Sequence, residues 1–242
     1  MKKQQFIIAF ILILFCHYYT LYASQAPTGD PLSKRESSLV TIAATTAKGD
    51  LTKLKDALNK GLDAGLTSNQ IKESIIHLYA YAGFPRSIRG LQALMDVLEE
   101  RKAKGINDPT GADASPIQND QPKYERGKAI LEQLTGIPEK EPKTGYAAFA
   151  PTIEIFLKEH LFADIFERDV LTYAERELVT ISVLASLGGV EPMLKSHLNI
   201  CLNVGLSEGQ LQQFISIIES TVGKQQAVEV QKILDEVLAN RK

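Results

Sequence analysis

Cysteine is scarce in this chain of 242 residues, which contains only Cys16 and Cys201. Cys16 lies in an N-terminal segment that we expect to be cleaved, so the mature chain keeps one thiol. A single thiol cannot form an internal disulfide, nor the C-x-x-C pair on which dithiol redox chemistry depends. The sequence therefore excludes dithiol chemistry within one mature chain.

An excess of positive charge is also missing, because 27 lysines and arginines are balanced by 29 aspartates and glutamates. A nucleic-acid-binding protein presents a basic stripe to the phosphate backbone, whereas the cations here are spread among the acids. The four histidines, His17, His77, His160 and His197, show no close metal-ligand spacing. We predict no nucleic-acid partner, no metal and no cofactor.

The N-terminal segment has the residue order of a secretory signal peptide. Two lysines precede an apolar run over residues 6–15, and small residues follow between Ala23 and Ala26. The run is shorter than the ~20 apolar residues that span a bilayer. We expect a signal peptide over residues 1–26, with no membrane contact after cleavage, and a periplasmic or secreted mature protein. An uncleaved anchor is the alternative.

Two stretches of the chain repeat one another in order. Residues 32–42 match residues 171–181, both ending in Leu-Val-Thr-Ile, and further matches follow in the same order. An ordered set of matches indicates an internal duplication. We predict helical repeat 1 at 27–104 and helical repeat 2 at 123–242. Between them, residues 105–122 are rich in turn formers and poor in apolar side chains, as is typical of a linker.

Helix-start and helix-stop signals recur at the same places in both repeats. Capping boxes, in which a hydroxyl and a carboxylate or amide satisfy orphan amides, are predicted at four helix starts. They are Ser33 with Glu36, Thr67 with Gln70, Thr172 with Glu175, and Ser207 with Gln210. Gly65 and Gly205 stand where a preceding helix should end. Apolar residues recur at helical spacing between these signals, so we predict an all-α fold, with a helix break near Gly83.

Three further segments carry recognisable patterns. Residues 73–85 read Glu-Ser-Ile-Ile-His-Leu-Tyr-Ala-Tyr-Ala-Gly-Phe-Pro, a histidine followed by Tyr-x-Gly-x-Pro. Residues 175–181 read Glu-Arg-Glu-Leu-Val-Thr-Ile, and Leu-Lys-Ser-His follows at 194–197. Residues 124–136 read Tyr-Glu-Arg-Gly-Lys-Ala-Ile-Leu-Glu-Gln-Leu-Thr-Gly. These segments resemble the third-helix motif, the central signature and the N-terminal lead-in of the carboxymuconolactone decarboxylase family.

The resemblance covers nearly all of the mature chain and implies two tandem helical units of the alkyl hydroperoxidase D-like kind. It also implies assembly into rings, with a homotrimer favoured for a chain of two units, and pockets near the subunit contacts. A small molecule is the implied substrate.

Decarboxylation requires a donor or cation that holds negative charge as carbon dioxide leaves, and an acid that protonates the carbanion. The resemblance assigns the family's histidine to His197, and Arg176 and Glu177 stand on the helix before it. His77 and Tyr81 belong to the motif at 73–85. We therefore predict catalytic roles for these five residues.

The two repeats have kept different halves of this pattern. Repeat 1 has Ala57 at the position of His197, and repeat 2 has Ile217 and Thr221 where repeat 1 has its histidine and tyrosine. One interpretation is a composite site built from both repeats. The other is loss of function after duplication.

Structural explanations compete with catalytic ones for single residues. His77 lies among apolar residues, as a core histidine does, and Glu175 is explained by its capping box. Cys201 lies one turn after His197, where a thiolate would be reactive, although a lone cysteine is commonly buried and inert.

Three functions follow from these patterns. The first is a cofactor-free decarboxylase or related lyase that acts on a small carboxylated substrate. The second is a non-catalytic oligomeric binding protein, which the divided motif favours. The third is the thiol-peroxidase activity found in the superfamily, which the missing C-x-x-C pair disfavours.

Overall fold

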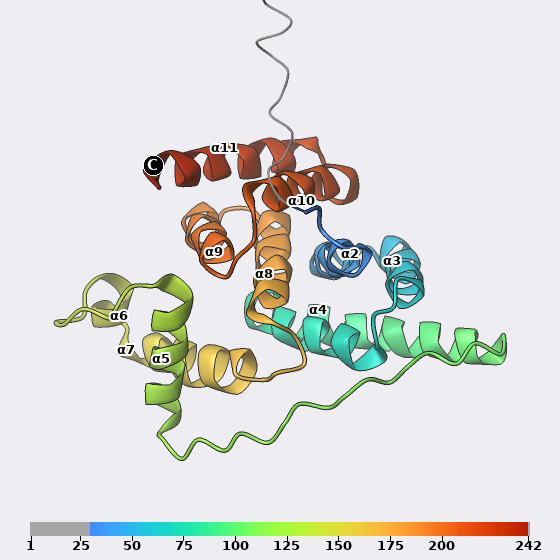
Figure 1. Cartoon of the computed structure of the whole chain (residues 1–242), viewed down its shortest axis with the longest axis horizontal. Coiled ribbons are helices and arrows are strands. Elements are labelled where there is room, and N and C mark those ends of the chain that lie inside the picture. The colour runs from blue at the N-terminus through green and yellow to red at the C-terminus, as the bar shows by residue number, and fades with distance from the viewer. Residues whose placement is uncertain (1–29, 242) are drawn as a thin grey trace, which may run out of the picture.

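The computed structural model describes residues 30–241, and the predicted signal peptide lies outside them. Within these residues the chain forms helices and no strand (Figure 1). The helices are α2 (Lys34–Lys48), α3 (Leu51–Asp63), α4 (Ser68–Ala103), α5 (Lys123–Thr135), α6 (Gly145–Phe149), α7 (Pro151–Phe156), the π-helix η1 (Leu157–Phe166), α8 (Tyr173–Leu187), α9 (Glu191–Asn203), α10 (Glu208–Thr221) and α11 (Lys224–Asn240). The all-α prediction is confirmed.

All four predicted capping boxes form, at the starts of α2, α4, α8 and α10. At α8 the backbone amide of Glu175 donates to Thr172 Oγ1 over 3.2 Å, and the amide of Thr172 donates to Glu175 Oε2 over 2.8 Å. These reciprocal bonds satisfy two amides that have no partner inside the helix. Glu175 is therefore bound at the helix start, as its capping box predicts.

Helix α4 is interrupted at Gly83, whose φ of 79° and ψ of 164° lie outside the helical region. This backbone conformation is essentially restricted to glycine. The corresponding glycine of repeat 2, Gly223, has φ 149° and ψ 164° and separates α10 from α11. The predicted break near Gly83 is confirmed, and the two repeats share it.

The two repeats share their hydrophobic cores. Helices α2 and α8, which carry the Leu-Val-Thr-Ile segments, pack against each other, while α4 packs on α8 and α10 packs on α2 (Figure 1). One apolar cluster joins Val40 of α2 to α8–α11, and another joins Val179 of α8 to α2–α4. Side chains at the junction of α4 with α8 and α9 therefore come from both repeats.

The predicted linker contains no helix and follows α4 back toward α5 (Figure 1). Asn69, in the first turn of α4, fixes it by donating from Nδ2 to the carbonyls of Gly111 and Ala112, each over 3.1 Å. No described helix has the length and apolar character needed to cross a bilayer.

Helices α5 and η1 pack closely and enclose a third apolar cluster. Gly127 makes the approach possible, because a Cβ at this position would lie 1.9 Å from the carbonyl oxygen of Lys158. A π-helix such as η1 is rare and often marks a functional site. At the end of η1, Phe166 contacts the ring of His77 edge-on, with centroids 4.9 Å apart.

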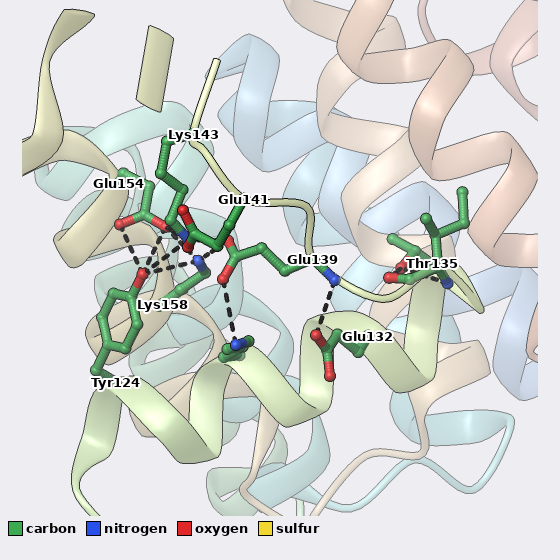
Figure 2. A network of polar contacts seen from close by, with 10 residues as sticks. Tyr124, Glu132, Thr135, Glu139, Glu141, Lys143, Glu154 and Lys158 are labelled. Atoms are coloured by element: carbon green, nitrogen blue, oxygen red, sulfur yellow. Dashed lines mark hydrogen bonds and ion pairs between the residues drawn. The ribbon is translucent and has the colours of Figure 1, made fainter. Parts of the chain in front are cut away.

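A buried ion network ties the segment between α5 and α6 to η1 (Figure 2). The Lys158 side chain is only 2% exposed and contacts the carboxylates of Glu139 and Glu154. Its Nζ also donates to the Tyr124 hydroxyl over 3.0 Å, and Lys143 contacts both carboxylates. Although burial raises the pKa of Glu139, hydrogen bonds from the two lysines outweigh it and lower the pKa to about 2. Both carboxylates are therefore charged and paired.

Candidate active site

The five predicted site residues lie together where α4, α8 and α9 meet. Helix α4 contributes His77 and Tyr81, α8 contributes Arg176 and Glu177, and α9 contributes His197. Hydrogen bonds and ring contacts link them without a gap. The structure thus brings the two retained half-motifs into one constellation.

Within this constellation, His197 and Glu177 form a hydrogen-bonded pair. His197 Nδ1 lies 2.8 Å from Glu177 Oε2, and because a carboxylate only accepts, Nδ1 carries the proton. The bond leaves His197 Nε2 for other chemistry, and this side chain is 13% exposed. Glu177 is fully buried, and its Oε1 has no hydrogen-bond partner among the described residues. A buried, unsatisfied carboxylate oxygen is costly, so it favours a ligand or water that donates to it.

Tyr81 lies between the two histidines. Its ring meets His197 edge-on, with centroids 5.9 Å apart, and its centroid lies 5.6 Å from that of His77. Burial and the nearby Glu177 raise the pKa of the Tyr81 hydroxyl. Tyr81 is therefore a neutral phenol at physiological pH and has a proton to donate.

His77 is completely buried, as the core interpretation predicts, yet it is also part of the constellation. Its Nε2 lies 2.8 Å from Thr180 Oγ1, and its Nδ1 lies 3.4 Å from Arg176 Nη1. Burial and the Arg176 charge hold the pKa of His77 well below its usual value. His77 is therefore a neutral imidazole.

Arg176, which contacts His77, is held in place by other residues of the chain. Its guanidinium is fully buried, pairs with Glu73 over 2.8 Å and donates to the carbonyl of Arg168 over 2.6 Å.

The sequence interpretation missed Glu73 and Thr180. Thr180 belongs to the repeated Leu-Val-Thr-Ile segment, which folding alone explains, and Glu73 is the first residue of the motif at 73–85. The signal available in the sequence was a carboxylate four positions before His77, on the same face of the predicted helix.

Cys201 does not support thiol chemistry. It is fully buried one turn after His197, and burial, with the charge of Glu177, raises the pKa of its thiol well above the usual value. The thiolate that a nucleophilic cysteine needs is therefore not populated near neutral pH. Among residues 30–241, no three His, Cys, Asp or Glu side chains gather closely enough to hold a metal ion.

The pseudo-equivalent position, where α10 meets α2 and α3, carries none of these groups. Ser38 stands in place of Glu177, and its hydroxyl is used within its own helix, donating to the carbonyl of Lys34 over 2.8 Å. Ala57, Ile217 and Thr221 stand in place of the two histidines and the tyrosine. The described chain therefore holds one such constellation, and both repeats contribute to it.

Comparison with known proteins agrees with this duplicated architecture. The model of the carboxymuconolactone decarboxylase family matches residues 15–96 and residues 151–236, together more than half of the chain. The chain is also similar to the 4-carboxymuconolactone decarboxylase of Acinetobacter baylyi (strain ATCC 33305 / BD413 / ADP1), with 29% identity over 100 residues. That alignment covers 40% of this chain and 72% of the relative. The two family matches confirm the resemblance and the tandem arrangement.

Proposed function

The chain belongs to the carboxymuconolactone decarboxylase family, and we propose that it is a cofactor-free decarboxylase or related lyase acting on a small carboxylated substrate. The observation that carries the proposal is the buried Glu177–His197 pair with the Tyr81 hydroxyl beside it. The pair supplies a proton-transfer group, and the tyrosine supplies a neutral donor for developing negative charge.

In the proposed reaction the bond between the substrate's carboxylate carbon and its neighbouring carbon breaks. Carbon dioxide leaves, and the electron pair remains as an enolate-type carbanion. The Tyr81 O–H donates to the oxygen on which negative charge develops. His197 in its doubly protonated form, stabilised by Glu177, transfers its Nε2 proton to the carbanion, and solvent then restores that proton.

A panel of β-keto acids and carboxylated lactones, with carbon dioxide release as the readout, tests this function. We expect the wild type and Cys201→Ser to release carbon dioxide from at least one member, and His197→Gln to lose that activity. Cys201→Ser serves as the matched control because it changes the neighbouring turn of α9 without removing the proton-transfer group.

Other outcomes of the panel contradict the decarboxylase. A wild type that binds members of the panel without releasing carbon dioxide would instead support the non-catalytic binding protein. Peroxide reduction that disappears in Cys201→Ser would support the thiol-peroxidase alternative, against which the burial of Cys201 argues.

We also propose that the protein is a homo-oligomer, with a trimer favoured. The support is an apolar surface on α6 and α7, where Tyr146, Phe149, Ile153 and Phe156 are 57%, 92%, 54% and 59% exposed. Large exposed apolar patches mark interaction sites, and the two helices that carry these side chains contact each other. Light scattering should give three times the chain mass for the wild type and a smaller assembly for Phe149→Ser; a monomeric wild type would contradict the proposal.

Export to the periplasm or beyond is a further proposal, supported by the residue order at 1–26. We expect the protein in the exported fraction to lack its first 23 or 26 residues, as mass spectrometry would show. A full-length chain confined to the cytoplasm would contradict it.

A further inference from the structure

The buried groups behind Tyr81 form a hydrogen-bond chain with one direction. Arginine only donates, so the Arg176 contact requires a lone pair on His77 Nδ1 and places the imidazole proton on Nε2. His77 Nε2–H then donates to Thr180 Oγ1 over 2.8 Å. The single proton of the Thr180 hydroxyl is then shared between two acceptors, the carbonyl of Arg176 at 3.0 Å and the Tyr81 oxygen at 3.3 Å.

Glu73, whose side chain is 3% exposed, anchors the far end of this hydrogen-bond chain. Its carboxylate accepts from Arg176 over 2.8 Å and, bidentately, from Arg168, which is 37% exposed at the surface. The bidentate pair with Arg168 fixes the orientation of the Glu73 carboxylate, which in turn accepts a single hydrogen bond from Arg176 Nη2. Glu73 thereby holds the Arg176 donor against His77.

We propose that Glu73 and Thr180 are positioning residues, which fix His77 as the Nε2–H tautomer and leave the Tyr81 O–H free to donate to an anionic oxygen of the carboxylated substrate. This inference rests on the proposed decarboxylase function and assigns no chemical step to either residue. Both act through other side chains.

The pseudo-equivalent position, where α10 meets α2 and α3, shows that folding alone does not require this hydrogen-bond chain. Thr41, the counterpart of Thr180, keeps the bond to its own helix, donating to the carbonyl of Ser37 over 2.9 Å, with no histidine beside it. Gln213, the counterpart of Glu73, accepts from the backbone amide of Leu32 over 2.8 Å. An uncharged residue therefore satisfies the fold at the Glu73 position.

The test combines the nitrogen NMR spectrum of His77 with turnover of Thr180→Val, Thr180→Ser and Glu73→Gln on the substrate found in the panel. We expect wild type and Thr180→Ser to show a proton on Nε2 and none on Nδ1. Thr180→Val and Glu73→Gln should mix the tautomers and lower kcat about tenfold, the size of one buried hydrogen bond, with KM nearly unchanged.

Two results would overturn the proposal. One is a wild-type His77 with its proton on Nδ1. That result would reverse the direction of the hydrogen-bond chain, whatever the activity of the enzyme. The other is a Thr180→Val enzyme that keeps wild-type kcat while His197→Gln loses it. Because the tautomer is measured without substrate, a wild type with no decarboxylase activity counts against the proposed function, and the tautomer still decides the direction of the chain.

Discussion

Glu177→Gln should lower the turnover of the decarboxylation by about a hundredfold or more, within the range that proton-transfer catalysis contributes. The substitution keeps the size of the side chain and removes the charge that stabilises the doubly protonated His197, 2.8 Å away. Since an amide also fills the space beside α9, the fold should persist. Steady-state kinetics of carbon dioxide release, with circular dichroism to verify folding, is the measurement.

The matched control is Glu175→Gln, two residues earlier on the same helix. Glu175 is held in the capping box at the start of α8, and glutamine also closes such a box. We therefore expect its turnover to stay close to that of the wild type. Equal losses in the two variants would mean that the charge of α8 as a whole matters, and would contradict the role given to Glu177.

Lys158→Met should lower the free energy of unfolding by roughly 3 kcal/mol, as expected when one partner of a buried ion pair is removed. The variant leaves the carboxylates of Glu139 and Glu154 close together, with Lys143 as their remaining shared cation (Figure 2). Because Lys143 remains, we expect a loss of stability at the lower end of the range of about 3–5 kcal/mol for a broken buried ion pair. Urea unfolding measures the effect.

Lys195→Met is the control for this experiment. Lys195 pairs with Glu236 at the surface, where their side chains are 38% and 48% exposed. Exposed pairs contribute little to stability, so the unfolding free energy should be nearly unchanged. A Lys158→Met variant no less stable than this control would show that the buried network does not stabilise the fold.

The same network predicts how the stability difference depends on pH. The pKa of Glu139 is about 2 in the folded chain and about 4.3 for an unperturbed glutamate. A lowered folded-state pKa gives stability that is complete above the unfolded value and disappears as the pH falls toward the folded value. The difference in unfolding free energy between wild type and Lys158→Met should therefore be largest near neutral pH. It should decrease as the pH falls from about 4 to about 2.

The sequence predicted the helical scaffold because its signals are local. Each capping box joins residues three positions apart, and Gly83 needs only its own backbone angles to interrupt α4. The His197 assignment came from family resemblance, and the structure places that residue with the other four. The complementary loss of half-motifs, visible in the alignment of the repeats, suggested the composite arrangement.

What the sequence did not reveal depends on contacts between distant segments. Glu73 and Arg176 are 103 positions apart and meet only because α4 packs on α8. Thr180 looked like a folding residue because Thr41 repeats it, and the difference lies in what faces each hydroxyl. The burial of Lys158 depends on Gly127 allowing α5 to approach η1, which no local pattern records.

The most direct test of a single site built from both repeats compares Tyr81→Phe with His197→Gln in the carbon dioxide assay. The first variant alters repeat 1, and the second alters repeat 2. One composite site predicts that each substitution alone removes most of the activity, and that the double variant is hardly worse than the more damaged single one. If each repeat held its own site, each single variant would keep about half of the wild-type rate, and that result would contradict the account.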